Sequence, residues 1–523
     1  MALDIIINGG RLVDGTGTPW RRADVGILGG RIATIGCLQD TVAQRRIRAD
    51  GQIVCPGFID IHAHADLTLP ANEGHIERLR QGITTEVLGQ DGLSYAPASA
   101  QHLREWRRYL IGLNGEGASL DWAWSSVAEY LERVDGKTAN AVYLVPHGAV
   151  RVEAMDWADR PATASEMQHM QTLVAEGLDQ GALGLSTGLS YIPCTHATTE
   201  ELITLCRPVA KAGGILAIHL RSYGPTILDA LDEAISIGRT TGVAVQVSHL
   251  RIAGPENRGK APEISARIDT ARAEGVDITF DAYPYKVGCA PLFCLIPAWA
   301  QAGGPDAILA RLGDENERVR MRAEIHGWGV DWEMYTLSNA PHTDLGDWEG
   351  DSLPEAAQGS TRDVETFIMD LLLETQLNAT IVAHGGNWED DEYLARHPAG
   401  MVCSDGVFVG DHPHPRGYGT FPRVLAYYVR ERRILSLEEA VNKMTAAPAA
   451  RLNLNDRGVL RIGAAADVVI FDPDKVEDRA TYADSRRPPE GIEWVLVNGE
   501  PVVAEGQPTG ALVGQVLSRL STL

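Results

Sequence analysis

Short apolar runs alternate with helix-length segments through the middle of this 523-residue chain, and no other feature restricts its fold as strongly. Near-continuous apolar runs are typical of parallel strands buried on both faces. Segments 163–178 and 227–239 have helical length, and the first opens with the capping-box sequence Thr163-Ala164-Ser165-Glu166. The expected strands are 58–62, 83–89, 141–145, 182–186, 215–220, 244–249, 277–283 and 401–404.

Eight such runs with helices between them predict an α/β protein whose centre is a (β/α)8 TIM-like barrel over residues 56–454. One further apolar run, 380–384, leaves the strand count open. Segment 287–361 is irregular, rich in Gly, Pro and Trp, and long for a barrel loop. We therefore expect it to be an insertion over one rim of the barrel, where it could serve as a lid.

Both ends of the chain differ from the middle, because their sequence pattern predicts short strands separated by turns without helices between them. Near the N-terminus, Gly29-Gly30 lies between two apolar runs, which is a hairpin signal, and the C-terminal end repeats the pattern around Asn498-Gly499. Because chain termini are often close in space, residues 1–55 and 455–523 are predicted to form one small composite β-sandwich domain.

Charge and cysteine content exclude several classes of function. The chain has 46 Lys and Arg against 70 Asp and Glu, a net charge of −24, and such an acidic surface repels nucleic acid and anionic lipid. We therefore expect neither a nucleic-acid partner nor a membrane partner. The N-terminus lacks the positive charge of a signal peptide, and the seven cysteines are scattered, so we expect reduced thiols in a cytoplasmic protein.

Histidines follow the ends of the predicted strands, where barrel active sites are built. His62 and His64 lie one pleat apart, so both side chains project to the same side and could reach one metal ion. His-x-His is nevertheless common by chance. His219 and His249 end two successive β–α units. A single histidine there is more often a core residue, but two at equivalent positions after a His-x-His strand favour metal ligation.

Two carboxylates extend the candidate set. Asp405 follows the last strand, and Asp91 follows the second strand in the sequence Gln90-Asp91-Gly92. Asp-Gly is a common turn pair, so spacing alone favours a turn role for Asp91. Imidazoles and carboxylates together suit one or two zinc ions, with manganese or cobalt as alternatives. The candidate metal ligands are His62, His64, Asp91, His219, His249 and Asp405.

The order His-x-His, His, His, Asp on barrel strands resembles the amidohydrolase superfamily. The chain is more closely similar to the N-acyl-D-amino-acid deacylases (D-aminoacylases), over nearly its whole length. The segments that carry the resemblance are 57–64, 181–189, 247–249, 281–285, 404–406 and 413–425, the last reading Pro-His-Pro-Arg-Gly-Tyr-Gly-Thr-Phe-Pro-Arg-Val-Leu.

The resemblance implies a role for each matching residue. One metal position would be held by His62, His64 and Asp405, and the other by His219 and His249. Asp405 would also be the catalytic general base. The substrate-binding residues would be Tyr191, Arg251, Tyr283 and Arg416. The chain departs from the family at two of these sites, with Asp91 in place of a metal-binding cysteine and Arg251 in place of a lysine.

The resemblance implies a metal-dependent hydrolase that cleaves the amide bond of a small molecule, an N-acyl-D-amino acid. Two alternatives stay open. One is a cyclic-amide or dipeptide hydrolase of the same superfamily, similar to dihydropyrimidinases or isoaspartyl dipeptidases. The other is a catalytically silent barrel scaffold. The sequence leaves the acyl group, the side chain and the oligomeric state undetermined. His147 and Arg151, after the third strand, fit a role at the site and a structural role equally well.

Overall fold

The computed structural model describes residues 2–71 and 75–518. Within these residues, the helices are all too short or too polar to cross a membrane.

A closed ring of parallel strands forms the centre of the molecule. β8 (Phe58–Asp60), β9 (Ile83–Leu88) and β10 (Asn140–Tyr143) pair in parallel, and Leu144 alone separates β10 from β11 (Val145–Pro146). A parallel bridge between Ala63 and Gly406 joins the last strand to the first. This ring confirms the predicted barrel, and its remaining strands are β12 (Gly184–Gly188), β13 (Ile215–His219), β14 (Ala244–Val247), β15 (Ile278–Ala282) and β19 (Gly400–Val402).

Helices cover the outside of this ring because each has one apolar stripe to bury. In α9 (Ile227–Thr241) the buried residues Ile227, Leu231, Ala234 and Gly238 recur at helical spacing. The capping box predicted at Thr163 is present, with the Glu166 carboxylate accepting the Thr163 backbone N–H. Other helices of the outer layer are α7 (Ala164–Asp179), α8 (Thr199–Lys211) and α10 (Ala261–Ala273).

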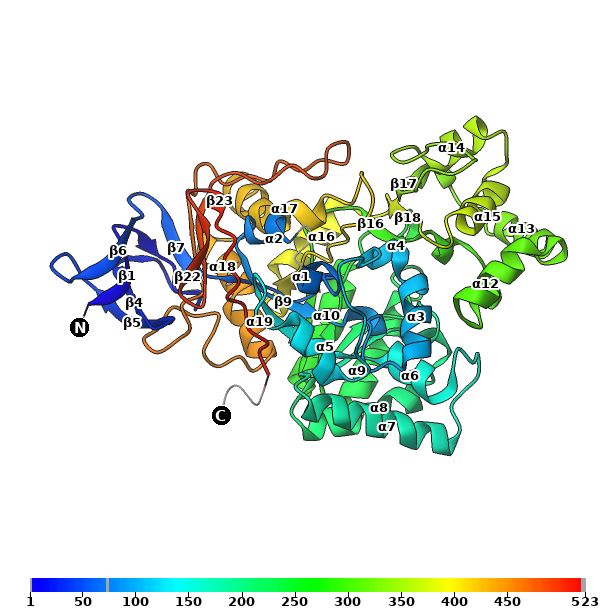
Figure 1. Cartoon of the computed structure of the whole chain (residues 1–523), viewed down its shortest axis with the longest axis horizontal. Helices are drawn as coiled ribbons and strands as arrows, with labels where there is room; N and C mark the ends of the chain where they lie inside the picture. The colour runs from blue at the N-terminus through cyan, green and yellow to red at the C-terminus, as the bar shows by residue number, and fades with distance from the viewer. Residues whose placement is uncertain (1, 72–74, 519–523) are drawn as a thin grey trace.

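Strands from both ends of the chain share one sheet. β20 (Val468–Phe471) pairs antiparallel with β7 (Ile53–Pro56), and Figure 1 shows blue N-terminal and red C-terminal strands side by side. A second sheet, from the N-terminal segment alone, packs on it through buried aliphatic side chains. The second sheet comprises β5 (Arg31–Gly36), β4 (Asp24–Leu28), β1 (Leu3–Asn8) and β6 (Ala43–Arg48). The remaining strands of the shared sheet are β23 (Gln507–Pro508), β22 (Glu500–Ala504), β21 (Ile492–Val497), β2 (Arg11–Leu12) and β3 (Arg21–Arg22).

The apolar run 380–384, whose place was open, lies outside the barrel. It forms β18 (Thr380–Ala383), which pairs antiparallel on one side with β16 (Gly288–Pro291) and on the other with β17 (Tyr335–Asn339). This sheet and the helices near it project from one rim, at the upper right of Figure 1. Those helices are α12 (Gly304–Gly313), α13 (Glu315–Gly327), α14 (Leu353–Gly359) and α15 (Val364–Glu374). The predicted limits of the domains and of the insertion stay predictions.

The buried carboxylate of Asp467 connects the terminal strands to the barrel. It accepts hydrogen bonds from Asn140 Nδ2 in β10 (3.0 Å) and from the Asn498 backbone N–H (2.7 Å), and it forms an ion pair with Arg457. Arg457 is itself buried, so the guanidinium would lose its compensating charge if Asp467 were removed.

We expect Asp467→Ala to lower the free energy of unfolding by about 3–5 kcal/mol, the usual cost of leaving one member of a buried ion pair alone. Asp474→Ala, at an exposed position of the same domain, serves as the control and should change it by less than about 0.5 kcal/mol. Calorimetric melting of both variants checks this. Equal melting temperatures for the two would contradict a connecting role for Asp467.

Candidate metal centre

The six predicted ligands come from strands that are distant in sequence and meet at one rim of the barrel. His62 and His64 follow β8, His219 ends β13, and His249 follows β14. The carboxyl ends of parallel strands meet at one edge, so side chains placed there converge. All six side chains are buried; the other two are Asp91, in the 3-10 turn η1 (Gln90–Gly92), and Asp405, after β19.

Asp91 contacts both pairs of histidines. Its Oδ1 lies 3.6 Å from His62 Nε2, and its Oδ2 lies 3.6 Å from His64 Nε2. The same Oδ2 lies 3.7 Å from His219 Nδ1 and 3.7 Å from His249 Nε2, and these two nitrogens are 3.0 Å apart. Asp91 therefore occupies the position of a carboxylate that bridges two sets of nitrogen ligands.

Asp405 completes the first set of ligands. Its Oδ1 lies 3.2 Å from His64 Nε2 and 3.6 Å from His62 Nε2. Ligand atoms of three groups lie within 4.8 Å of one another: His62, His64 and Asp91; His62, His249 and Asp405; and Asp91, His219 and His249.

Several buried polar atoms in this cluster have no hydrogen-bond partner among the described residues. They are both ring nitrogens of His62, His64 Nδ1 and Asp91 Oδ1. An unpaired buried polar group is costly, and native proteins rarely tolerate one without a partner, an ion or a function. A divalent cation beside Asp91 would satisfy His62 Nε2 and Asp91 Oδ1, so the residues present fit a metal centre.

The protonation equilibria also favour a cation. Burial lowers the pKa of His62, but the carboxylates of Asp91, Asp405 and Asp281 outweigh burial and raise it to about 9. Burial lowers the pKa of His219 to about 4, so this imidazole is neutral, as a metal ligand must be. A cluster that draws a proton onto one of its histidines has an excess of negative charge that a divalent ion would neutralise.

Three of the candidate ligands have left-handed backbone conformations, which side-chain-bearing residues rarely adopt. Their φ angles are 57° for Asp91, 30° for His249 and 48° for Asp405. The turn at Asp91 is held by Gly92, whose N–H donates to Ser186 Oγ (3.0 Å) and where an added Cβ would lie 2.8 Å from Cys194 Sγ. Asp91 is thus a turn residue whose carboxylate also lies at the centre of the cluster, and neither interpretation excludes the other.

Two residues that hold the candidate ligands in position, Asp281 and Ser190, were not predicted as site residues from the sequence. Asp281, inside β15, accepts the His249 backbone N–H (2.7 Å) and Gln246 Nε2 (2.7 Å), and its Oδ1 lies 3.9 Å from His62 Nδ1. Ser190 Oγ lies 2.7 Å from His219 Nε2, on the side of the ring that faces away from Asp91. A carboxylate inside the apolar run 277–283 was a signal for Asp281, since Asp is rarely fully buried without a partner.

The predicted substrate-binding residues lie beside the metal cluster. The Arg416 guanidinium pairs with Asp405 (Nη1–Oδ2 2.7 Å) and lies 4.7 Å from the centroid of the Tyr283 ring. Arg251 donates from Nη1 to the Tyr283 hydroxyl (2.8 Å) and lies against Gly288, where only a glycine leaves room for it. The Tyr191 ring lies 4.6 Å from that of His219. Two guanidiniums therefore face one tyrosine at the side of Asp405.

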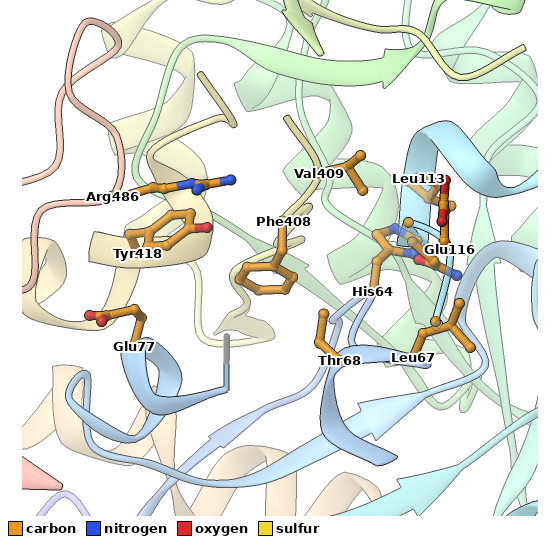
Figure 2. Close-up of a pocket in the computed structure, with 13 residues that line it drawn as sticks. His64, Leu67, Thr68, Glu77, Leu113, Glu116, Phe408, Val409, Tyr418 and Arg486 are labelled. Carbon is orange, nitrogen blue, oxygen red and sulfur yellow. The ribbon is translucent and has the colours of Figure 1, made fainter. Parts of the chain in front are cut away.

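A cavity of about 670 Å³ joins these residues to the insertion. Its wall near the barrel includes the metal cluster, Tyr191, Arg251, Tyr283 and Arg416, and its far wall includes Trp328, Val330, Met334 and Tyr335. A second cavity, of about 340 Å³, shares His64 and Leu113 with the first (Figure 2).

His147 and Arg151 have structural partners. His147 Nε2 lies 2.9 Å from Glu201 Oε1, and Arg151 Nη1 lies 2.6 Å from the same oxygen. Neither residue belongs to the described lining of the two cavities. This buried network joins α6 (His147–Met155) to α8 behind the turn that carries Asp91.

Comparison with known proteins agrees with this geometry. The model of the "Amidohydrolase family" matches residues 46–263 and 403–503. An N-acyl-D-glutamate deacylase of Alcaligenes xylosoxydans xylosoxydans is 38% identical over 99% of this chain and 97% of its own length, and a D-aminoacylase of the same organism is 36% identical over 99% and 98%. The solved structure of the Bordetella bronchiseptica N-acyl-D-glutamate deacylase was determined with zinc and a phosphonate mimic of the tetrahedral intermediate. It is 35% identical to this chain, with a TM-score of 0.84 over 99% of this chain and 100% of that one.

Asp91→Asn separates the ligand role of Asp91 from its turn role. Asparagine tolerates left-handed φ, so the turn should persist, while the negative charge that balances a cation is lost. We expect the purified variant to contain at least about tenfold less tightly bound divalent metal by elemental analysis, and Asp91→Cys, which offers a thiolate, to recover it. A full metal content in Asp91→Asn would leave Asp91 as a turn residue only.

Proposed function

The chain belongs to the amidohydrolase family, and from this premise we propose that it is a metal-dependent deacylase of N-acyl-D-amino acids. It hydrolyses the amide bond and releases a carboxylate and a free D-amino acid. The observation that carries the proposal is the convergence of four histidines and two carboxylates at one rim, directly beside the buried Arg416 and the half-buried Arg251. A catalytically silent scaffold has no use for such a set.

We assign zinc to this centre. His62, His64 and Asp405 would hold one position, His219 and His249 the other, and Asp91 would contact both. When bound, a divalent ion supplies Lewis-acid polarisation of the amide carbonyl and activation of water near neutral pH. The carboxylate at position 91 is a harder ligand than sulfur, which supports acceptance of manganese or cobalt as well.

Asp405 is the proposed general base. Burial alone would raise the pKa of Asp405, but Arg416, His249, His64 and His62 hold it below its usual range, so the carboxylate is ionised and can accept a proton. Its Oδ1 faces the histidines and its Oδ2 faces Arg416. It would take a proton from the attacking water and deliver it to the leaving amine.

Arg416, Arg251 and Tyr283 are the proposed binding site for the α-carboxylate of the substrate. Both guanidiniums contact the same tyrosine, Tyr283, so their positive charges lie on the same side of the cavity and could bind a single carboxylate together. A planar guanidinium offers paired donors that match a carboxylate. This site would fix the amino-acid half of the substrate, with its amide carbon held at the metal centre.

The wall beyond this anion site favours an uncharged side chain. Trp328, Val330, Met334 and Tyr335 make it largely apolar, and Glu256 and Asp331 add acidic side chains to the lining of the cavity. Among the described residues that line the whole cavity, Arg251 and Arg416 are the only Lys or Arg side chains, and the α-carboxylate would occupy both. We therefore propose apolar D-amino acids such as D-methionine or D-leucine, in place of the D-glutamate named for one relative.

We also propose that the protein functions in the cytoplasm. All seven cysteines are free thiols, and four of them, Cys55, Cys194, Cys206 and Cys403, are buried.

The substrate proposal is tested with N-acetyl derivatives of D-methionine, L-methionine and D-glutamate on metal-loaded enzyme. We expect kcat/KM for the D-methionine derivative to exceed that for the other two by at least about tenfold, equivalent to about 1.4 kcal/mol. If Glu256 and Asp331 repel the side-chain carboxylate of a D-glutamate substrate, E256Q/D331N should raise kcat/KM for the D-glutamate derivative only. Failure on every acyl-amino acid would overturn the function, whereas a preference for D-glutamate would overturn only the side-chain proposal.

Asp405→Asn tests the proposed general base. The variant should fold normally but lose at least about a hundredfold in kcat, the usual contribution of general acid–base catalysis. Asp232→Asn, on the outer helix α9, is the matched control and should retain full turnover. Near-normal turnover of a correctly folded Asp405→Asn would remove Asp405 from the mechanism.

A further inference from the structure

The second cavity shares His64 of the metal centre but is not lined by Arg251 or Arg416. Figure 2 shows His64 at one end beside Leu67, Leu113 and Val409. Thr68 and Phe408 lie in the middle, and the far end is bounded by Glu77, Tyr418 and Arg486. Glu116 also lies beside His64, so apolar side chains line much of the cavity while charged side chains stand at both of its ends.

His64 and Leu113 belong to both cavities, so the two spaces adjoin at the metal cluster. If the proposed function is right, the scissile amide carbon lies at this junction, because His64 Nε2 is 3.2 Å from the general base Asp405. The α-carboxylate and the amino-acid side chain are accommodated in the larger cavity. An amide is planar and almost always trans, so the acyl substituent leaves the carbonyl carbon on the side opposite the amino-acid carbon.

We propose that the second cavity is the acyl-chain site of this enzyme and that it takes linear acyl groups longer than acetyl. This inference rests on the proposed function. The cavity, at about 340 Å³, is far larger than the space of about 30 Å³ that one water occupies in the liquid, so several methylene groups fit. Leu67, Leu113, Val409 and Phe408 supply the apolar wall that such a chain requires.

The ring of Phe408 is held in place on two sides. The Arg78 guanidinium lies 4.8 Å from its centroid, and the Tyr418 ring packs against it edge-on at 5.8 Å. Arg78 is buried and forms an ion pair with Asp60 (2.5 Å), which in turn accepts the Ser404 backbone N–H (2.8 Å) next to Asp405. The wall of the acyl site is therefore anchored to the same strand ends as the general base.

The far end sets a limit on chain length. Glu77 and Arg486 carry charges there, and a methylene chain that reaches them would gain no further burial in an apolar environment. The inference therefore predicts a rise of kcat/KM with chain length, followed by a plateau, instead of a continuous increase.

The experiment is a series of N-acetyl-, N-butanoyl-, N-hexanoyl- and N-octanoyl-D-methionine on the zinc-loaded enzyme. In the native enzyme we expect kcat/KM to rise about twofold to fourfold per methylene up to a plateau. Val409→Trp, which fills the second cavity, should lower the ratio of kcat/KM for the hexanoyl substrate to kcat/KM for the acetyl substrate at least tenfold. Val330→Trp, the matched variant in the larger cavity, should respond to the amino-acid side chain and leave the acyl series parallel to that of the native enzyme.

Binding measured without turnover gives an independent readout. In Asp405→Asn, calorimetric Kd values for the same four compounds should fall with chain length, and Val409→Trp in that background should abolish the trend. A flat acyl series in both assays, with N-acetyl-D-methionine still hydrolysed, would overturn the acyl site and leave the proposed function standing. Absence of turnover on every member of the series and also on N-acetyl-D-glutamate would overturn the proposed function itself.

Discussion

The contact of one carboxylate with four imidazoles organises this molecule. Asp91 lies within 3.7 Å of nitrogens from His62, His64, His219 and His249, which come from three different strands. Buried negative charge of this kind is tolerable only beside a compensating cation. The barrel places these strand ends close together. The left-handed turn at Asp91 and Gly92, held by the hydrogen bond from the Gly92 N–H to Ser186 Oγ, directs the Asp91 carboxylate to the same place.

Arg416 lies between this anionic centre and the larger cavity, where the substrate is proposed to bind. It neutralises part of the charge of Asp405 in the free enzyme, and the same guanidinium lies over Tyr283 at the edge of the larger cavity. A substrate carboxylate would compete with Asp405 for Arg416 and so reduce the stabilisation of the ionised general base. In the proposed mechanism, substrate binding would thus raise the proton affinity of Asp405 at the step that requires proton transfer. Arg251 also contacts Tyr283, so its guanidinium would bind the same substrate carboxylate together with Arg416.

The sequence was sufficient for the barrel and for the residues that converge at its rim, because both follow from periodicity. Strand side chains alternate, so His62 and His64 had to share a face, and parallel strands place His219 and His249 at equivalent ends. Residues whose place depends on loop conformation could not be predicted in this way. Val409, in a loop, and Leu113, in the short helix α4 (Ile111–Asn114), are separated by almost three hundred positions and line one cavity only in the folded chain. The strand 380–383 could be assigned outside the barrel only from its antiparallel partners.

The division of the site into two cavities has a physical consequence for specificity. One wall is built largely from the insertion, with Trp328, Val330 and Tyr335, and the other from loops that leave the barrel strands directly, with Leu67 and Val409. The two cavities share only His64 and Leu113 among their described lining residues. If each cavity holds one half of the substrate, as proposed, a substitution in one would change the free energy of binding for that half with little coupling to the other. Selection can therefore alter the preferred amino-acid side chain through the insertion while the acyl preference and the metal cluster stay constant, which is consistent with relatives that share this fold and differ in the amino acid they are named for.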